Sequence, residues 1–437
     1  MMLTKHKLGD LLEVTRGASL SGEYFATQGD YMRLTCGNFD YQSNCFKSNT
    51  SKDNLYYTGN FNQEYLMEKD DIITPLTEQA VGLLGSTAWV PEGGKYIQSQ
   101  DVAKITPNER LLDKKFCYYL ISSKVVKQQL SAAAQQTKIR HTSPDKIKDC
   151  TVWIPSLEEQ TKIGQFLYDI DSKIALNRQI NDNLEAMARQ LYDYWFVQFD
   201  FPDENGRPYK SSGGKMILNK DLHLCVPEKW DVCELHDFIL DNNTGDWGYD
   251  SKSDEHPIEV TCIRGADIIR LINLPQRYIK TRNASKFLHP WNIVIEVSGG
   301  SPIQATGRCA LITPGVLKRN GGKVTCSNFC HAFTMQEDFY SAYFYYTWKV
   351  LYDNNNMFNY EGKTSGIKNF MTSMFLANKW VRVPQDLMMS FYEKVKVIYK
   401  EIDNNIEEIS SLSKQRNELL PLLMNGQATV NYHLSDD

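Results

Sequence analysis

Two stretches of the chain carry an apolar residue at every seventh position, in two interleaved series. In the first stretch, 156–198, one series is Ile163, Ile170, Asn177, Leu184 and Leu191, and the other is Leu167, Ile174, Asn181, Ala188 and Trp195. A repeat of this length predicts one long helix with an apolar seam that faces another helix. Ser156 stands three residues before Glu159, a spacing typical of a capping box, so we expect the helix to start there.

The second stretch carries the same seam 228 residues later. Its series are Phe391, Ile398, Asn405, Leu412 and Leu419, and Val395, Ile402, Ile409, Arg416 and Leu423. Three asparagines on these seams, Asn177, Asn181 and Asn405, would fix the register and the choice of partner helix; the alternative is solvent-facing asparagines on frayed helices. About 35 residues at about 1.5 Å each give a rod of roughly 50 Å, or about one and a half turns of B-DNA.

Ahead of each helix lie short runs rich in Val, Ile, Tyr and Thr, such as YMRLT, DDIIT, IEVTCI and NIVIEV. These runs predict strands joined by turns, accompanied by short helices such as the one in LDKKFCYYLISSKVVKQQL. The two regions align, with Leu8 over Leu235, Ile139 over Ile367 and Pro155 over Pro384, at shifts of 227, 228 and 229. So long a period indicates two copies of a domain-plus-helix module and not a solenoid.

The predicted fold class is α+β, with two mixed α/β domains that are each followed by a long helix. The simplest closed arrangement pairs the two helices as an antiparallel coiled coil with pseudo-two-fold symmetry, although the sequence also permits a parallel pairing. We expect a first domain at 1–155, its helix at 156–198, a second domain at 227–384, its helix at 385–425 and a tail at 426–437. Pro, Gly, Asn and Ser in FDFPDENGRPYKSSGGKM predict a linker at 199–226.

Charge and composition narrow the choice of function. A net charge of −5 and a pI of about 6.0 argue against a strongly basic nucleic-acid binder that works alone, so local patches or partners would have to supply phosphate contacts. The ten cysteines are scattered, and the nearest approach to a metal cluster, Cys326 with Cys330 and His331, lacks a second ligand pair, so we expect no metal. No apolar run is long enough to span a bilayer and the N-terminus does not resemble a signal peptide, which predicts a cytoplasmic protein without membrane contact.

Motifs for catalysis are missing from the sequence. Neither NPPY nor DPPY occurs, as adenine methylation would require, and there is no GxSxG nucleophile elbow. KSSGGK at 210–215 has the wrong order for a phosphate-binding loop and follows no apolar strand. Asp70 with Asp71, or Asp145 with Lys146, could pass a loose search for a metal nuclease, but exposed turn charges explain both pairs as well. We therefore expect no catalytic residue.

Several motifs resemble those of one known family. IPSLEEQTKIGQFLYDIDSKIALN and LEAMARQLYDYWFVQFDFPDENGRPYKSSGGKM are similar to the first helix entry and the central junction of the DNA-specificity subunits of type I restriction-modification systems. VPEKWDVCEL, with Pro227 and Trp230, is similar to the entry of their second target-recognition domain, so the resemblance covers nearly the whole chain. Pro384-Gln385-Asp386 departs from the pattern because it lacks the doublet Glu159-Gln160, and so the two helix starts need not make equivalent contacts.

The resemblance implies a non-catalytic subunit whose two target-recognition domains each read one half of a bipartite, asymmetric site on double-stranded DNA. It also implies that two modification subunits, which carry S-adenosylmethionine, dock on the long helices, and that restriction subunits driven by ATP and Mg join them. This chain would bind no cofactor itself, and its partners would supply part of the phosphate contact. The expected helix-pairing or subunit-interface residues are Gln160, Ile163, Leu167, Ile170, Ile174, Asn177, Asn181, Leu184, Phe391, Val395, Ile398, Ile402, Asn405, Ile409 and Leu412.

Side chains that read bases or hold phosphates are Arg, Lys, Asn, Gln, Ser and Thr, so loops rich in them are the candidate DNA contacts. In the first copy the candidates are Arg16, Arg33, Thr35, Asn38, Thr77, Gln79, Gln135, Gln136, Lys138 and Arg140. In the second copy they are Arg264, Ser301, Gln304, Arg308, Lys363, Lys368 and Asn369. Because Lys138 lies near the place of Lys368 in the duplicated register, the two copies could grip phosphates alike.

Two other functions stay open at this point. A restriction nuclease or methyltransferase with the same recognition modules would be active as a purified chain with metal or S-adenosylmethionine. A coiled-coil scaffold without a DNA role would not prefer a bipartite sequence over random duplex.

Overall fold

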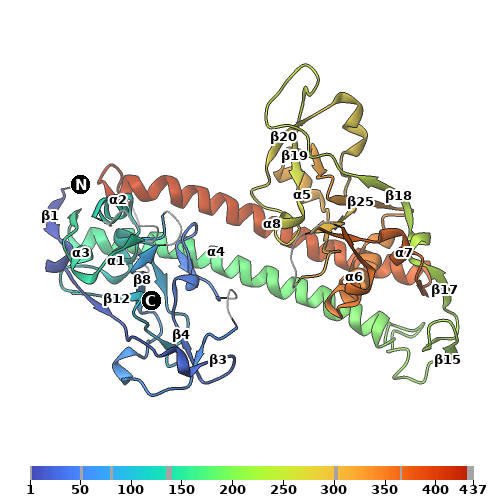
Figure 1. The fold of residues 1–437 in the computed structure, drawn as a ribbon, viewed down its shortest axis with the longest axis horizontal. Coiled ribbons are helices and arrows are strands. Elements are labelled where there is room, and N and C mark those ends of the chain that lie inside the picture. Colours follow the sequence, from blue (N-terminus) through green and yellow to red (C-terminus); the bar gives the residue numbers. More distant parts are fainter. Residues whose placement is uncertain are drawn as a thin grey trace. The chain divides into compact units, whose positions relative to one another are not determined.

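The structure is a computed structural model that describes residues 2–49, 53–78, 82–133, 140–299, 304–364 and 367–430. The chain divides into two compact units, unit 1 at Met1–Ala175 with Ser410–Asp437 and unit 2 at Leu176–Ile409. Two long helices, α4 (Leu157–Tyr192) and α8 (Gln385–Met424), contribute residues to both units (Figure 1). Sheets and helices occur in both units, which confirms the α+β class.

Unit 1 contains two four-stranded sheets. The first has the order β10 (Ala88–Trp89), β8 (Ile72–Pro75), β12 (Val102–Pro107), β2 (Leu12–Arg16), and all its neighbours are antiparallel. The second has the order β11 (Tyr96–Ile97), β4 (Tyr31–Arg33), β7 (Tyr56–Tyr57), β3 (Phe25–Ala26), with β11 and β4 parallel. Three pairs of strands complete the unit: β1 (Thr4–Lys7) with β14 (Thr151–Ile154), β5 (Phe39–Asp40) with β6 (Cys45–Phe46), and β9 (Thr77–Glu78) with β13 (Arg140–His141).

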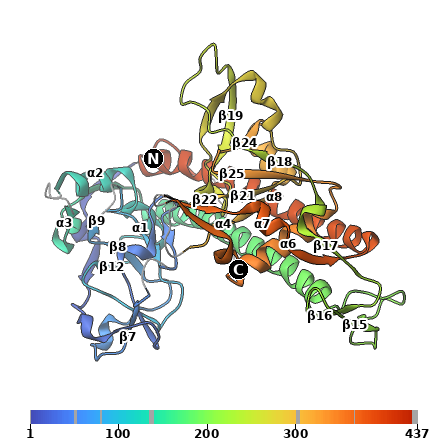
Figure 2. The same cartoon turned by 45° about the vertical axis from the view of Figure 1, so that its right-hand side comes forward.

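The helices of unit 1 are short and well capped. They are α1 (Lys114–Ile121), α2 (Lys124–Ala133) and α3 (Pro144–Lys148). Asp113 caps α1 by accepting a hydrogen bond from the Phe116 amide at 2.8 Å, and Ser143 with Pro144 starts α3. The apolar face of α1 packs against the first sheet and against the ends of both long helices in one core, which includes Phe116, Ile163 and Leu423. Figures 1 and 2 show these helices on the side of unit 1 away from the strands β3, β4 and β7.

Unit 2 repeats this plan with more residues. Its four-stranded antiparallel sheet has the order β18 (Ile239–Thr244), β25 (Cys330–Met335), β21 (Ile293–Glu296), β23 (Cys309–Leu311). Two three-stranded sheets follow, β20 (Gln276–Ile279), β19 (Ile258–Ile263), β24 (Val324–Cys326), and β22 (Ser298–Gly299), β27 (Ile367–Phe370), β26 (Glu361–Thr364). The helices are α5 (Pro314–Arg319), α6 (Tyr340–Asp353) and α7 (Thr372–Leu376), and β17 (Asp231–Glu234) pairs with β28 (Lys379–Arg382).

The strand orders show that the duplication extends to topology. The sheet β2, β12, β8, β10 has the same order as β18, β25, β21, β23, and the pairs β1–β14 and β17–β28 occupy matching places. The parallel pair β4–β11 recurs as β19–β24, and the pair β9–β13 recurs as β22–β27. The two modules therefore share one backbone topology, which we call the frame. The pseudo-two-fold relation between the modules stays a prediction.

The long helices pair antiparallel, as predicted. Within unit 2, Asn177 Nδ2 donates to Glu408 at 2.6 Å, and Asn405 Nδ2 donates to Asn181 Oδ1 at 2.8 Å. The residue numbers rise along α4 while they fall along α8, so the two chains run in opposite directions. In unit 1 the same helices are joined by Asp171 and Arg416, 2.6 Å apart.

The segment 199–226, predicted as a linker between the two domains, contains ordered structure, and its role as a linker stays a prediction. Phe199 and Phe201 are buried, and the Phe201 ring stacks on Tyr209 at 4.7 Å and on Trp230 at 5.1 Å between ring centroids. A hairpin follows, formed by β15 (Met216–Asn219) and β16 (Leu224–Pro227), and Figures 1 and 2 show it near the end of α4. Stacking of rings that lie far apart in sequence outweighs the turn-forming composition of the segment.

Candidate nucleic-acid interface

The first candidate stretch of unit 1, around Arg33, contains a turn that is held by its own side chains. Thr35 and Asn38 cap each other across the turn Cys36–Asn38, with the Thr35 amide donating to Asn38 Oδ1 at 2.9 Å. Asn38 is 3% exposed, so its amide cannot reach a base, and we remove it from the candidate contacts. Arg33 lies over the Phe25 ring at 3.8 Å and donates to the Asn54 carbonyl, and burial lowers its pKa.

Three further candidates of unit 1 that the structure describes lie at strand ends. Arg16 is exposed and donates through Nε to the Gln100 carbonyl at 2.7 Å. Thr77 Oγ1 lies 2.9 Å from the sulfur of Cys36. Arg140 is about one third exposed and lies 3.7 Å from Glu78. Gln79, Gln135, Gln136 and Lys138 lie outside the described residues.

In unit 2 the candidate Arg264 is exposed, but it already has a partner. Its guanidinium forks onto Asp267, with contacts of 2.8 and 2.9 Å, and this pair raises the pKa of Arg264. Asn369 accepts a hydrogen bond from Ser298 at 2.6 Å, which joins β27 to β22. Ser301 and the side chain of Lys363 lie outside the described residues.

Two further candidates of unit 2 are held in buried ion pairs. Arg308 forks onto Glu296 with contacts of 2.8 and 2.6 Å, and Lys368 Nζ lies 2.9 Å from Glu361 and 3.4 Å from the Gln304 carbonyl. The side chains of Arg308 and Lys368 are only 16% and 14% exposed. If either cation left its partner to bind a phosphate, a buried carboxylate would lose its charge partner, which is unfavourable. We therefore no longer count Arg308 and Lys368 among the direct DNA contacts.

The sequence prediction missed the acids that hold these cations. Glu78, Glu296 and Glu361 have side chains that are 4%, 7% and 6% exposed. Burial alone would raise the pKa of Glu361, yet bonds from Lys368 and the Thr306 amide outweigh it and bring that pKa below its ordinary value. The signal was present for Glu296, which ends the apolar run IVIE, because a charged residue inside such a run needs a partner.

The predicted interface residues lie mostly along the contact between the long helices. Ile163, Leu167, Ile170, Ile174, Asn177, Phe391, Val395 and Ile402 are buried, and Asn181, Leu184, Ile398, Asn405, Ile409 and Leu412 are half-buried. Gln160 differs from this set. It is 1% exposed and joins α4 to its own module, with Nε2 donating to the Pro155 carbonyl and Oε1 accepting from the Asp113 amide, both at 3.0 Å.

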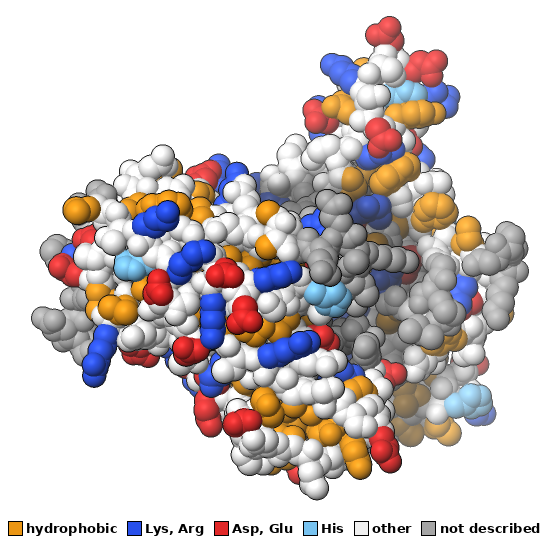
Figure 3. Space-filling view, turned by 60° about the vertical axis from the view of Figure 1, so that its left-hand side comes forward, with side chains coloured by type: hydrophobic (Ala, Val, Ile, Leu, Met, Phe, Trp, Pro, Cys, Tyr) orange, Lys and Arg blue, Asp and Glu red, His pale blue; other side chains and the backbone are white. Residues whose placement is uncertain are grey.

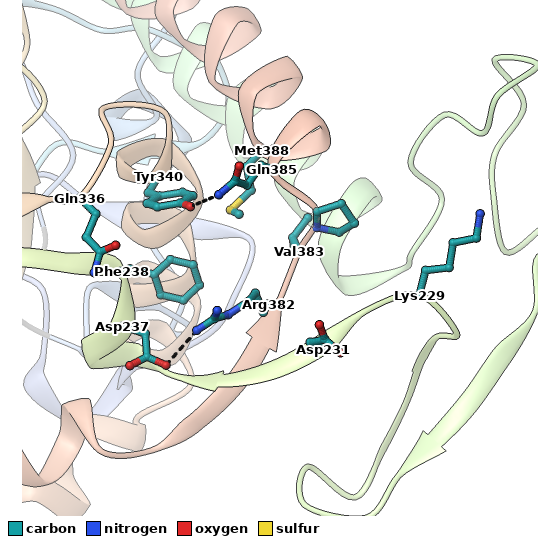
Figure 4. Close-up of a pocket in the computed structure, with 11 residues that line it drawn as sticks. Lys229, Asp231, Asp237, Phe238, Gln336, Tyr340, Arg382, Val383, Gln385 and Met388 are labelled. Atoms are coloured by element: carbon teal, nitrogen blue, oxygen red, sulfur yellow. Dashed lines mark hydrogen bonds and ion pairs between the residues drawn. The ribbon is translucent and has the colours of Figure 1, made fainter.

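The start of α8 makes different contacts, as the missing doublet suggested. Gln385 is exposed and donates to the Tyr340 hydroxyl at 2.8 Å, beside the ion pair between Arg382 and Asp237 at 3.0 Å. Figure 4 shows these residues around a cleft of about 580 Å³ with polar walls. The first long helix is therefore locked to its domain by a buried amide, whereas the second begins on an open cleft.

Neither a metal cluster nor a membrane helix occurs in the part of the chain that the structure describes. No three His, Cys, Asp or Glu side chains there are grouped to hold an ion. Burial raises the pKa of the Cys326 thiol well above its ordinary value, which disfavours the thiolate that a metal needs. The helices of the described ranges also include none that is both long and apolar enough to cross a membrane.

Comparisons with known proteins agree with this picture. The family described as type I restriction modification DNA specificity domain matches residues 3–186. The type I restriction enzyme MjaIX specificity subunit of Methanocaldococcus jannaschii is 24% identical over 344 residues, which cover 76% of this chain and 73% of that protein. The type I restriction enzyme HindI specificity subunit of Haemophilus influenzae is 31% identical over 107 residues, covering 24% of this chain and 23% of that protein.

A solved structure shows the same fold along the whole chain. The S subunit of the type I restriction-modification system from M. genitalium is 16% identical, and the match covers 99% of this chain and 97% of that one with a TM-score of 0.56. At this identity the likeness concerns the fold alone.

Proposed function

Because the chain belongs to the family of DNA specificity subunits of type I restriction-modification systems, we propose that its two modules each read one half of a bipartite DNA site and that modification subunits dock on its long helices. As a specificity subunit it is the non-catalytic chain of such a system. In this proposal S-adenosylmethionine, ATP and Mg bind to the partners, and the complex works in the cytoplasm.

The observation that carries the proposal is the duplicated frame. Both modules present the end of an antiparallel sheet and a two-strand ladder, β9–β13 in one and β22–β27 in the other, in the same order along the chain. One frame with two different sets of loop side chains is what two readers of different half-sites require. In this proposal the identity of the target bases depends on the loop side chains and not on the shared backbone topology.

Exposed cations supply part of the DNA contact in this proposal. Arg16 and Arg140 in unit 1 and Arg264 in unit 2 have exposed or partly exposed guanidinium groups. The face in Figure 3 carries Lys and Arg side chains interspersed with Asp and Glu, and no field of a single sign. With a net charge of −5, tight binding would then need phosphate contacts from the partners.

An apolar stripe on α4 supports the docking of a partner helix. Leu176, Ile180 and Met187 are 50%, 37% and 55% exposed. Their spacings of 4 and 7 residues place them within about 40° of one another around a helix, on a face left open by the pairing with α8. A partner helix with its own apolar stripe would cover this face.

The test is co-expression with a modification subunit, followed by mapping of methylated adenines across a host genome. We expect one bipartite motif, and replacement of residues 227–384 by the matching domain of another member should change one half of it. Methylation without a bipartite motif, or a motif that both halves lose together, would contradict the proposal. Activity of the purified chain with metal or S-adenosylmethionine would instead favour an enzyme.

Docking is tested by Met187→Glu, with Ala186→Glu as the matched control. Both residues are exposed on α4, and successive helical residues point about 100° apart. We expect Met187→Glu to weaken co-purification of the modification subunit at least tenfold and Ala186→Glu to leave it unchanged. Equal effects of the two variants would place the partner elsewhere.

A further inference from the structure

Three segments of unit 2 that were candidates for reading DNA share two buried carboxylates at their base. The segments are the turn after Arg264, the stretch 304–308, and the hairpin of β26 and β27. The carboxylates belong to Glu296, at the end of β21, and Glu361, at the start of β26.

Glu296 fixes the first two segments. Its carboxylate takes both contacts of the Arg308 fork, at 2.8 and 2.6 Å, and its backbone amide donates to the Arg308 carbonyl at 2.8 Å. The backbone of Gly265 presses on the same carboxylate, because a Cβ there would lie 2.7 Å from Oε1. A Cβ on Gly299, in β22, would lie 3.2 Å from that oxygen. Glu296 thus binds Arg308 directly and lies close to the backbone of the turn and of β22.

Glu361 fixes the second segment from the other flank. It accepts hydrogen bonds from the Thr306 amide at 2.7 Å and from the Thr306 hydroxyl at 3.2 Å, and it pairs with Lys368 at 2.9 Å. The same Lys368 lies over the Phe358 ring at 5.1 Å. The stretch 304–308 is therefore held at Thr306 by one carboxylate and at Arg308 by the other.

Unit 1 contains a related arrangement with one acid. Glu78 accepts from the amides of Gly82 at 2.6 Å and Leu83 at 3.0 Å, which ties the end of β9 to these two residues. Arg140 stands opposite Glu78 in the β9–β13 ladder, and its guanidinium lies 3.7 Å from the other carboxylate oxygen. In the β22–β27 ladder the residue at the place of Arg140 is Lys368, opposite Gly299.

We propose that Glu78, Glu296 and Glu361 are positioning residues for sequence reading: they fix the loops that meet the bases, and Arg308 and Lys368 act through them and not on DNA. This inference rests on the proposed function. It predicts that loss of one pair changes which bases its own half-site accepts, while the number of phosphate contacts stays the same. A direct phosphate contact predicts the reverse.

The experiment uses the complex assembled with its modification subunit and compares the parent with Glu361→Gln, Lys368→Gln and Glu78→Gln. Methylated adenines are mapped, and binding to the parent's site is measured over a range of salt concentrations. We expect the unit 2 variants to relax discrimination by about tenfold at one or more positions of one half-site, and Glu78→Gln to do so in the other half. The slope of log K against log salt should match that of the parent for all three.

Lys368→Arg provides the rescue control because it keeps the cation beside Glu361. We expect it to restore the parental motif, and cooperative thermal unfolding of each variant shows that its module is folded. If Glu361→Gln fails this folding check, the folded Lys368→Gln with its rescue decides the question.

Two outcomes would overturn the inference. One is an unchanged motif in folded variants. The other is a salt slope lowered by about 0.9 in Lys368→Gln with the motif intact, since that is the loss expected for one phosphate contact. Failure of the proposed function is distinguishable, because the parent complex would then show no bipartite motif at all.

Discussion

In unit 1 the ladder β9–β13 places Arg140 opposite an acid, Glu78, on the neighbouring strand, whereas in unit 2 the ladder β22–β27 places Lys368 opposite Gly299. Lys368 pairs instead with Glu361 on β26, at the other edge of the sheet. The two modules thus share a backbone frame but not the residues that hold their loops. Because strand pairing fixes the backbone of each module, the acid can stand on a different strand in each, provided that it still pairs with the cation.

Some contacts of the frame permit no such exchange. Gly17 and Gly245 stand 228 residues apart at the ends of β2 and β18. A Cβ would lie 2.2 Å from the Gln98 carbonyl oxygen at Gly17 and 2.1 Å from the Cys326 carbonyl oxygen at Gly245. Both obstacles are backbone atoms of the neighbouring strand region, which cannot turn aside as a side chain can. This close approach is common to both modules.

The largest predicted effect comes from substitutions that remove this close approach. Gly17→Ala and Gly245→Ala should each destabilise their own unit by about 3 kcal/mol, at the upper end for overpacking, because a backbone shift must make room for the methyl group. Urea unfolding followed by probes in each unit measures the loss. Gly22→Ala and Gly362→Ala are matched controls, since the nearest atoms to a Cβ there lie 3.8 and 3.7 Å away. Equal effects of variants and controls would contradict the argument.

The next prediction compares how the long helices are joined in the two units. In unit 1, Arg416 on α8 binds Asp171 on α4 at 2.6 Å and donates to the Ser43 carbonyl at 3.2 Å, and its side chain is 10% exposed. Asp171→Ala would leave that guanidinium without its carboxylate partner, and we expect a loss of about 2 kcal/mol, reduced from the fully buried case because Asp171 is 25% exposed. Asp182→Ala, at an exposed position of α4, is the control. A loss no larger than that of the control would show the pair to be dispensable.

In unit 2 the contact between Asn405 and Asn181 joins two neutral side chains, and its removal should cost less. Asn405→Ala deletes the 2.8 Å hydrogen bond to Asn181, for which we expect about 1 kcal/mol. Asn405→Leu should be more stable than Asn405→Ala but should favour other registers. Cross-links between cysteines introduced at positions 177 and 408, whose side chains are in contact across the two helices, would detect such a shift in the parent and in the Leu variant. Unaltered cross-linking in the Leu variant would remove the register role of Asn405.

The helices and the duplication could be predicted from the sequence because both depend on residue class in a regular order. The heptad series needed only apolar residues at fixed spacing, and seam positions such as Ile163 and Phe391 are buried accordingly. The antiparallel direction could not be derived in this way, because a seam looks the same in either direction. Contacts such as Asn181 with Asn405 decide it.

The candidate site was harder to predict because a polar residue does not reveal which way it points. Asn38 was predicted as a candidate DNA contact, yet it caps its own turn. Arg308 was predicted as a candidate DNA contact too, yet it is bound by Glu296, an acid 12 residues earlier on a neighbouring strand. Which charged residues become partners depends on the register between paired strands, and the spacing of charges along the chain does not encode that register. The ring contacts inside 199–226 could not be predicted for the same reason, since Phe201 meets Tyr209 and Trp230 only after folding.

The smallest predicted effect is a dependence on acid pH that belongs to unit 2. Burial opposes ionisation of Glu361, but bonds from Lys368 and Thr306 bring its pKa below the ordinary value of 4.5. A carboxyl whose pKa falls on folding stabilises the folded state fully above its unfolded pKa and loses that contribution as pH drops through the folded pKa. The urea midpoint of unit 2 should therefore fall less between about pH 6 and about pH 3 in Glu361→Gln than in the parent. Glu337→Gln, which alters an exposed carboxylate of the same unit, should follow the parent. If all three proteins lose stability in parallel, Glu361 does not anchor its loop through its charge, and the difference between the two modules would be one of geometry alone.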